Sequence, residues 1–190
     1  MPALILTLAV FAYLSAALLM FGARKPAYSH RRHTISELGE SGAPLAGLVA
    51  AGVFLPIGLG MLLAAWLARP LGSGISALAL CIAVGYLTAA AFPCDPGSPL
   101  SGSWRQAVHN LGGTVQYIGG AFVLLQMAGH AGQPFRAFGL FVIGAAIALS
   151  VPLLANVRGL VQRVAEGCLF GGLALAAWRA WRAWRAVGQA

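Results

Sequence analysis

Charge is scarce in this chain. Only 8% of its 190 residues are Asp, Glu, Lys or Arg, and only four of these are acidic. A water-soluble domain carries about 25% charged residues, because it must cover its surface. The hydrophobic fraction of 59% and the mean hydropathy of +0.83 therefore exclude an ordinary soluble domain. The sequence predicts a protein that faces lipid.

Cysteine is equally scarce. The chain has three cysteines, no CxxC pair and no other zinc-type spacing, and an odd number cannot pair fully within one chain. Cys81 and Cys168 fall inside hydrophobic runs, where packing is their expected role, and Cys94 lies near a helix end. Neither a disulfide framework nor a cysteine zinc site is predicted.

Long hydrophobic runs, in contrast, are abundant. A helix of about 20 residues crosses the hydrocarbon core of a bilayer. Six runs suit such a helix: 3–21, 45–68, 75–92, 111–128, 137–156 and 164–181. They are continuous rather than alternating, which favours helices over a β-barrel. We predict an all-α polytopic membrane protein, a six-helix transmembrane bundle that forms a single domain over 1–190.

Polar residues concentrate in three stretches, 33–44, 92–110 and 157–166, in alternate gaps between the runs. A chain that crosses a bilayer six times places alternate gaps on the same side. These stretches should therefore meet at one membrane face, which we call the motif face. All four acidic residues and His109 belong to it, so the sequence predicts one candidate site there.

Basic residues outnumber acidic ones, with a net charge of +8. This excess indicates contact with anionic lipid headgroups. The chain has no soluble basic surface interleaved with aromatic residues, so membrane lipids rather than nucleic acid are the expected partners. The repeat of Trp-Arg at 178–179, 181–182 and 184–185 predicts an interfacial anchor. A homo-oligomer is left open.

Several short motifs of the motif face follow one another in a familiar order. They are RHTISELG at 32–39, Gly85 upstream of FPCDP at 92–96, His109-Asn110, and GLVQR at 159–163. In this order they resemble the bacterial and archaeal membrane family catalogued as domain of unknown function 998. The 35–44 segment is similar, more distantly, to the first loop of DRAM/Sfk-type six-span membrane proteins.

The resemblance implies a six-helix protein of the inner (plasma) membrane, with cytoplasmic termini and an outward motif face. It implies no particular reaction. The positive-inside rule leans the other way, because seven cations lie on the motif side and five on the side of the termini. The first loop is also more basic than the family pattern. We expect the orientation that the resemblance implies.

Asp95 and His109 are the leading candidate pair. A carboxylate and an imidazole at one bilayer boundary can share a proton or hold a cation. In the structural alternative, Asp95 caps the turn or the start of the fourth span and accepts a hydrogen bond from His109.

A metal-dependent hydrolase is a second interpretation of the same residues. A catalytic zinc site needs three or four ligands and an open position for water. The candidate ligands are His33, Asp95 and His109, and the candidate catalytic residues are Ser36, Asp95 and His109. No GxSxG segment surrounds Ser36, which disfavours a simple Ser–His–Asp triad.

Charged and polar groups inside the spans need partners in the bundle. Arg163 lies three residues before Glu166, so an intrahelical ion pair is expected, with a proton or cation relay as the alternative. Tyr86, Thr88 and Gln116 are expected to form hydrogen bonds between helices.

The leading functional interpretation is binding or sensing of a lipid or other amphiphile at the motif face, with no covalent chemistry and no cofactor. The candidate ligand-binding residues are Arg32, Ser36, Glu37, Asp95, His109 and Arg163. The alternatives are a membrane lipid hydrolase that uses a divalent metal such as zinc, and a small transporter. No internal repeat supports a transporter.

Overall fold

The computed structural model describes residues 1–187, and within this range the chain forms helices and no strands. The elements are α1 (Pro2–Arg24), η1 (Ser36–Gly39), α2 (Ala46–Val49), η2 (Ala50–Phe54), α3 (Leu55–Ala68), η3 (Arg69–Leu71), α4 (Ser73–Ala91), α5 (Trp104–Thr114), η4 (Val115–Gly119), α6 (Gly120–Ala131), α7 (Gln133–Leu149), η5 (Pro152–Val157) and α8 (Arg158–Val187). The turns η1, η3 and η5 are 3₁₀-helical, whereas η2 and η4 are π-helical turns inside longer helices.

These elements form six rods, because α2, η2 and α3 run on as one helix and α5, η4 and α6 as another. Five segments are long and apolar enough to cross a membrane: Pro2–Arg24, Ala46–Leu71, Ser73–Ala91, Trp104–Gly129 and Pro152–Ala186. The sixth rod is α7, an apolar helix of 17 residues. The predicted six-helix membrane bundle is confirmed.

The rods pack against one another in a ring that follows chain order. α1 packs on α3, α3 on α4, α4 on α5 and α6, and α6 on α7; α8 packs on both α7 and α1 and closes the ring. Fully buried leucine and isoleucine side chains fill its interior, among them Ile57, Leu78 and Leu124. Large apolar side chains such as Leu19 and Phe141 are exposed on the outside, which suits a lipid surround.

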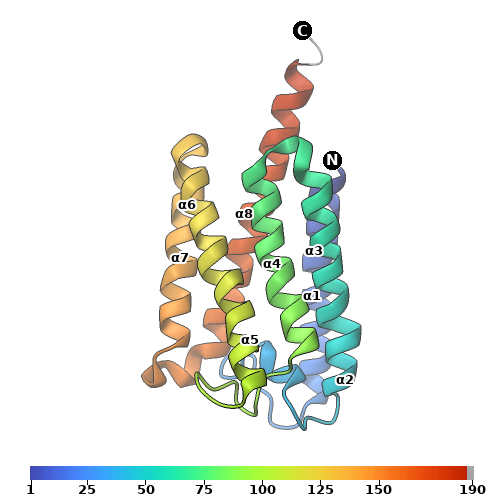
Figure 1. Cartoon of the computed structure of the whole chain (residues 1–190), viewed down its shortest axis with the longest axis vertical. Helices are drawn as coiled ribbons and strands as arrows, with labels where there is room; N and C mark the ends of the chain where they lie inside the picture. Colours follow the sequence, from blue (N-terminus) through green and yellow to red (C-terminus); the bar gives the residue numbers. More distant parts are fainter. Residues whose placement is uncertain (188–190) are drawn as a thin grey trace.

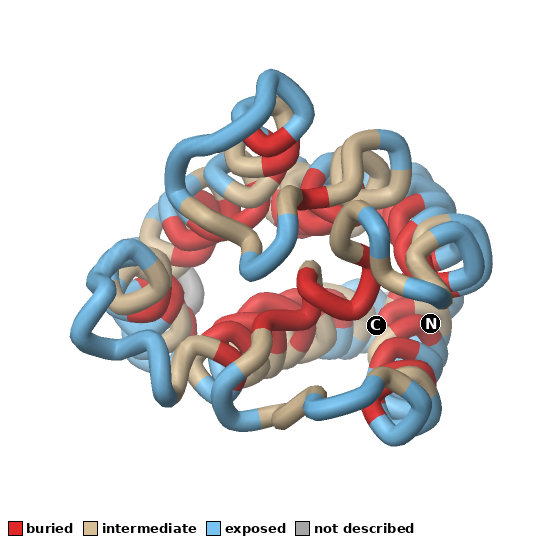
Figure 2. Tube along the Cα trace, turned by 90° about the horizontal axis from the view of Figure 1, so that it is seen from below, coloured by how far each residue is buried: buried red, intermediate tan, exposed pale blue. Residues whose placement is uncertain are grey.

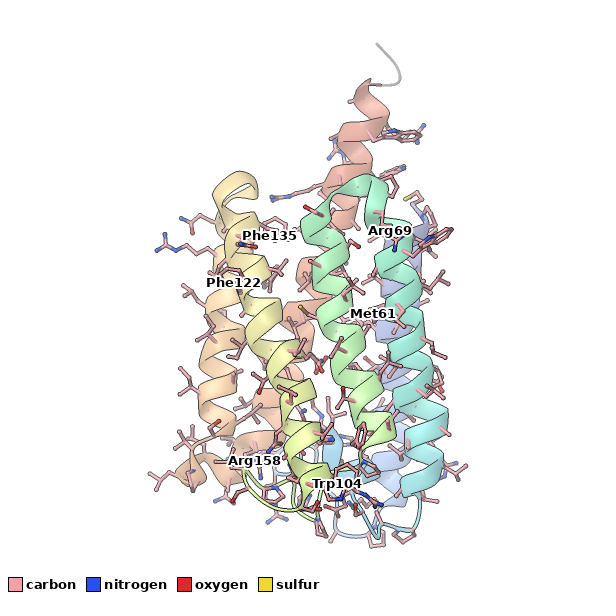
Figure 3. All side chains as sticks on the ribbon, in the orientation of Figure 1. Met61, Arg69, Trp104, Phe122, Phe135 and Arg158 are labelled. Atoms are coloured by element: carbon pink, nitrogen blue, oxygen red, sulfur yellow. The ribbon has the colours of Figure 1, made fainter. Side chains whose placement is uncertain are left out.

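Both termini lie at one end of the bundle and the polar loops lie at the other (Figure 1). Figure 3 shows Trp104 and Arg158 at the loop end and Arg69 near the opposite end. Seen from the loop end, a buried stretch of the first loop lies over the middle of the ring of helices (Figure 2). This stretch is Thr34–Gly39, in which only Ser36 is not classed as buried; we call it the plug. Four of its residues, Ser36–Gly39, form the turn η1.

Several helix boundaries differ from the predicted spans, and α8, for example, begins at Arg158 rather than at 164. The fourth rod begins at Trp104 rather than near 111, since Ser103 caps α5 by accepting a hydrogen bond from the Gln106 N–H. The predicted fifth span runs to 156, through Pro152, but α7 already ends at Leu149. Proline has no N–H to continue a helix, and Pro152 instead begins the turn η5 that leads into α8.

Candidate functional site

The plug is built around a capping box. The Glu37 carboxylate oxygen Oε1 accepts hydrogen bonds from the Thr34 N–H at 2.9 Å and the Thr34 hydroxyl at 3.0 Å, and Thr34 Oγ1 accepts from the Glu37 N–H at 3.3 Å. This reciprocal pairing is the known mechanism by which Thr-x-x-Glu starts a helix. Both residues are buried, so the capping box fixes the plug in a single conformation.

The plug and the rest of the first loop are docked on the start of α8. Gln162 Oε1 accepts a hydrogen bond from the Ile35 N–H at 2.5 Å. The Arg163 guanidinium donates to the Tyr28 hydroxyl at 2.8 Å and to the His33 carbonyl at 3.1 Å. Gly159 allows the close approach, because a Cβ there would overlap the carbonyl oxygen of His33. The first loop and α8 therefore form one unit.

Burial and the charge of Arg163 shift the pKa values of two loop residues beside it, His30 and Tyr28. Burial and the adjacent guanidinium lower the pKa of His30, whose Nδ1 lies 3.0 Å from Arg163 Nη2. A neutral His30 can accept this hydrogen bond. Burial raises the pKa of Tyr28 more than Arg163 lowers it, so the phenol stays protonated. Arg163 is thus a donor to the loop.

The second polar stretch joins the first loop and α8. Ser41 N–H donates to the Cys94 carbonyl at 2.8 Å, and Gly97 N–H donates to Glu40 Oε2 at 2.7 Å. Glu40 also forms an ion pair with Lys25 at 2.6 Å. Arg158 of α8 donates to the Ser98 carbonyl at 2.7 Å. All three polar stretches are therefore bonded to one another, as their alternate placement in the sequence predicted.

Ser36 and His109 meet at the centre of this assembly. The His109 Nε2 atom lies 3.1 Å from Ser36 Oγ, and its Nδ1 atom lies 2.9 Å from the Phe92 carbonyl oxygen. A carbonyl can only accept, so Nδ1 carries the hydrogen, and in the neutral ring Nε2 is left to accept the hydrogen bond of the Ser36 hydroxyl. The structure thus brings together two of the three candidate catalytic residues.

Asp95 does not join them, and the predicted hydrogen bond from His109 to Asp95 is wrong. The Asp95 carboxylate accepts from the Ser103 N–H at 2.7 Å and from the Ser103 hydroxyl at 2.8 Å. These two hydrogen bonds lower the pKa of Asp95. Since Ser103 caps α5, Asp95 holds the start of that helix, close to the structural role that the sequence suggested.

Glu166 is also differently placed. The predicted pair with Arg163 is not formed, because Arg163 turns to the first loop, whereas Glu166 faces the bundle interior. There Glu166 Oε1 accepts from Gln116 Nε2 and from the Tyr117 hydroxyl, both at 2.7 Å. The predicted interhelical role of Gln116 is confirmed. Among the described residues, Glu166 Oε2 and the Tyr86 hydroxyl are buried without a hydrogen-bond partner.

A cavity of about 590 Å³ lies beside the plug, between the start of the fourth rod, the end of α7 and the start of α8. The polar part of its wall includes Ser36, His109, Asn110, Arg158 and Gln162; the apolar part includes Leu100, Ile118, Ile147, Leu149 and Val151. α7 packs closely on α6 and diverges from α5 toward the loop end (Figure 1). This divergence leaves the cavity open between the two helices.

A second, much smaller cavity of about 40 Å³ lies deeper in the bundle, at Glu166 and Tyr86. The two cavities share lining residues: Ser36, His109, Gly113, Tyr117 and Gln162. Ser36 and His109 therefore stand between the buried carboxylate and the larger, open cavity.

The structure does not assemble the proposed metal ligands. Among the side chains that the structure describes, 1–129 and 132–186, no group of three or more His, Cys, Asp and Glu is placed to hold a metal ion. His33 Nδ1 instead accepts a hydrogen bond from the Ser29 N–H at 2.8 Å, and Asp95 is bound to Ser103. His33, Asp95 and His109 thus fail as a zinc site, because His33 and Asp95 are bonded within their own loops and His109 is bonded to Phe92 and Ser36.

Several polar residues of the site were not singled out from the sequence. Gln106 is fully buried and bonds the Asp95 N–H at 2.7 Å and the Asn110 side chain at 2.7 Å. Gln162 links the plug to Tyr117. The sequence did offer a signal for Gln106 and Gln162. A polar side chain on a membrane helix costs free energy unless it has a partner, so it marks a hydrogen-bond network or a site.

Comparison with known proteins yields one match. The family model described as "Protein of unknown function (DUF998)" matches residues 7–179. No curated protein and no solved structure matches the chain, and nothing in these comparisons supports the more distant likeness to DRAM/Sfk-type proteins. The matched range includes the plug, the second polar stretch and the start of α8. The chain therefore belongs to the DUF998 family.

Proposed function

We propose that this protein binds or senses a lipid or another amphiphile at the motif face, as a multi-pass protein of the inner (plasma) membrane. The observation that carries the proposal is the cavity of about 590 Å³ beside the plug. Small-molecule sites usually measure about 300–1,000 Å³ and combine apolar walls with a few placed polar groups. This cavity has one polar wall and one apolar wall, which can contact the polar and the apolar part of an amphiphile.

The position of the cavity supports entry from the bilayer. Ile118 of the fourth rod and Ile147 of α7 line it and are 46% and 61% exposed. These exposed apolar side chains can contact an acyl chain that lies between α5 and α7. Ser36, His109 and Asn110 lie on the inner wall, where they can meet the polar part of the same molecule.

Only some of the candidate ligand-binding residues line the cavity. Ser36 and His109 line it, whereas Glu37, Asp95 and Arg163 hold the loops that shape it. Arg158, which the sequence did not single out, supplies a cation to the wall. Its Nε atom is buried without a hydrogen-bond partner within the described range, and a guanidinium N–H suits a carboxylate or phosphate oxygen.

We also propose that the termini are cytoplasmic. The excess of cations at the motif face weighed against this orientation. Several of those cations, however, bind the protein itself: Lys25, Arg158 and Arg163. Four arginines are exposed on the motif side, at 24, 31, 32 and 105, and four on the side of the termini, at 69, 136, 182 and 185. The remaining charge no longer opposes the orientation that the family resemblance implies.

Native mass spectrometry of the protein, released gently from its own membrane, tests the binding proposal. Gly113 lines the cavity, and a Cβ at this position would meet no atom within 4 Å, so Gly113→Leu adds an apolar side chain at the cavity wall with no clash at Cβ. Gly171 in α8 is equally unobstructed and lies outside the cavity lining, so Gly171→Leu is the matched control. Both changes replace a helical glycine by a better helix former.

The wild type and Gly171→Leu should retain an adduct with the mass of a lipid, and Gly113→Leu should lose it by tenfold or more. Equal retention by all three proteins, or retention by none, would refute binding in this cavity.

A further inference from the structure

We infer that Ser36 and His109 act as a nucleophile and its general base, and that they hydrolyse a carboxylic ester of the amphiphile in the cavity. The inference rests on the proposed function, since it uses the same cavity. It goes further, because it assigns a reaction and a substrate class, a fatty-acyl ester.

The hydrogen bonds of the pair are those that a nucleophilic serine needs. A weakly acidic hydroxyl becomes a useful nucleophile when an adjacent base can take its proton and a third group orients that base. Here Ser36 Oγ is the hydroxyl, and His109 Nε2 is the base at 3.1 Å. The Phe92 carbonyl at 2.9 Å from Nδ1 is the orienting group. This carbonyl selects the tautomer with a free Nε2 lone pair, as a carboxylate does in a Ser–His–Asp triad.

Both members of the pair are held rigidly, although 73 positions separate them in the chain. Ser36 is the first residue of η1, which the capping box of Thr34 and Glu37 fixes. His109 is 8% exposed on α5, whose N-terminus is fixed by the Ser103 cap. Precise placement of this kind distinguishes a site from a chance contact, because reacting groups must stay within hydrogen-bond reach.

The pair is also accessible to a substrate. Both side chains line the open cavity, and Ser36 is the one plug residue that is only partly buried. An acyl chain along Ile118 and Ile147 would bring its ester group toward the inner wall. Arg158 on the same wall can bind a phosphate or another anionic group of the substrate.

The reaction balances with water as the only co-reactant. Ser36 Oγ forms a bond to the acyl carbon while its proton moves to His109 Nε2. The carbon–oxygen bond to the alcohol then breaks, and His109 returns the proton to the leaving alkoxide oxygen. A water molecule from the aqueous side of the motif face attacks the acyl carbon of the acyl-Ser36 ester while His109 takes its proton. The bond between the acyl carbon and Ser36 Oγ then breaks, and His109 returns the proton to Oγ. The products are an alcohol, a fatty acid and free Ser36.

A purely structural role for the same hydrogen bond makes a different prediction. If it only ties the plug to α5, Ser36 has no special reactivity toward electrophiles. A fluorescent fluorophosphonate, which forms a covalent bond with activated serines, separates the two cases. It should be applied to the full chain in its native membranes, and the modified residue should be mapped by peptide mass spectrometry.

The expected result is a phosphonate adduct on Ser36 of the wild type, and no such adduct in Ser36→Ala. His109→Gln should slow the modification about 10²- to 10⁴-fold, the usual contribution of a general base. Ser76 lies outside the cavity lining and its hydroxyl donates to the Ala65 carbonyl at 2.8 Å, so Ser76→Ala is the control variant and should react like the wild type. Hydrolysis of 4-methylumbelliferyl heptanoate in mixed micelles should follow the same order.

No adduct on wild-type Ser36 would overturn the inference, and this readout needs no variant to fold. Modification that is unchanged in a folded His109→Gln protein would overturn the role of the base. Lipid retention in native mass spectrometry separates the two proposals: a wild type that retains lipid but is not modified refutes the reaction alone. A wild type without lipid refutes the binding on which the reaction depends.

Discussion

Removal of the Glu37 carboxylate should release the plug from its fixed conformation. The carboxylate accepts hydrogen bonds from the N–H and the hydroxyl of Thr34, at 2.9 and 3.0 Å. Glu37 is 6% exposed and Thr34 is 4% exposed. In Glu37→Ala, two buried donors therefore lose their acceptor, with little water to replace it.

The magnitude follows from these contacts. A hydrogen bond to a charged acceptor contributes about 1.5–3 kcal/mol, so the loss of two should cost about 3–6 kcal/mol of the free energy of unfolding. Glu37→Gln keeps one neutral acceptor and should cost about 1–2 kcal/mol. Glu40 in the same loop is a carboxylate control. Its ion pair with Lys25, with both side chains 18% exposed, and its exposed hydrogen bond from the Gly97 N–H lie nearer the surface, and Glu40→Ala should cost about 1 kcal/mol.

The assay is reversible unfolding of the purified protein by SDS in mixed micelles, followed by circular dichroism and Trp fluorescence. The expected order of destabilisation is Glu37→Ala, then Glu37→Gln and Glu40→Ala together. A Glu37→Ala protein within about 1 kcal/mol of the wild type would refute the argument that the capping box holds the plug. It would also remove the support for a rigid Ser36.

Three further outcomes are expected. Gly159→Ala places a Cβ on carbonyl oxygens of the first loop, whereas a Cβ at Gly167 in the same helix meets nothing within 4 Å. In SDS titration, Gly159→Ala should lower the free energy of unfolding by about 2 kcal/mol, and Gly167→Ala should not lower it. Equal values for the two variants would contradict the close approach of the first loop to α8. The pKa of Asp95 is lowered from 3.8 by its hydrogen bonds to the serine that caps α5, so its stabilisation is present above about pH 3.8 and is lost as the pH falls through the lower folded value. Asp95→Asn should therefore unfold at a lower temperature at pH 7 and lose less stability on acidification than the wild type; an unchanged melting temperature at pH 7 would argue against this role. Cys94 has no exposed surface, and burial raises the pKa of its thiol to about 12, so Cys94 should resist an impermeant maleimide from either side of the membrane. A cysteine introduced by Ser101→Cys in the exposed loop should react from outside intact cells if the termini are cytoplasmic. Labelling of this variant only after lysis would show the reverse orientation.

Hydropathy alone was sufficient to predict the bundle and the common face of the three polar stretches. A long apolar run must cross the bilayer, and the number of crossings fixes the side of each gap. The plug was partly readable too, since Thr34 and Glu37 have the spacing of a capping box. Its position over the middle of the ring depends on a contact with Gln162, more than 100 positions away. Local sequence patterns cannot predict a contact between such distant residues.

The partners of the charged and polar groups were less predictable. His109 binds the backbone carbonyl of Phe92, and Asp95 binds a backbone N–H. Every residue offers such groups, so their choice of partner depends on the folded backbone rather than on residue type. The spacing of Arg163 and Glu166 allowed a pair, but docking of the first loop turned Arg163 away. The cavity arises from the angle between α5 and α7, which depends on packing along the whole length of both rods.

The short length of α7 also affects the surrounding bilayer. Its 17 residues extend over about 26 Å at 1.5 Å per residue, less than the roughly 30 Å of an average hydrocarbon core. Such a hydrophobic mismatch is relieved by local thinning of the membrane. α7 forms one side of the cavity mouth, so the bilayer is expected to be thinnest next to that opening. Thinning there draws headgroups inward, toward the level of Ser36 and His109, and shortens the path that a lipid must travel to enter.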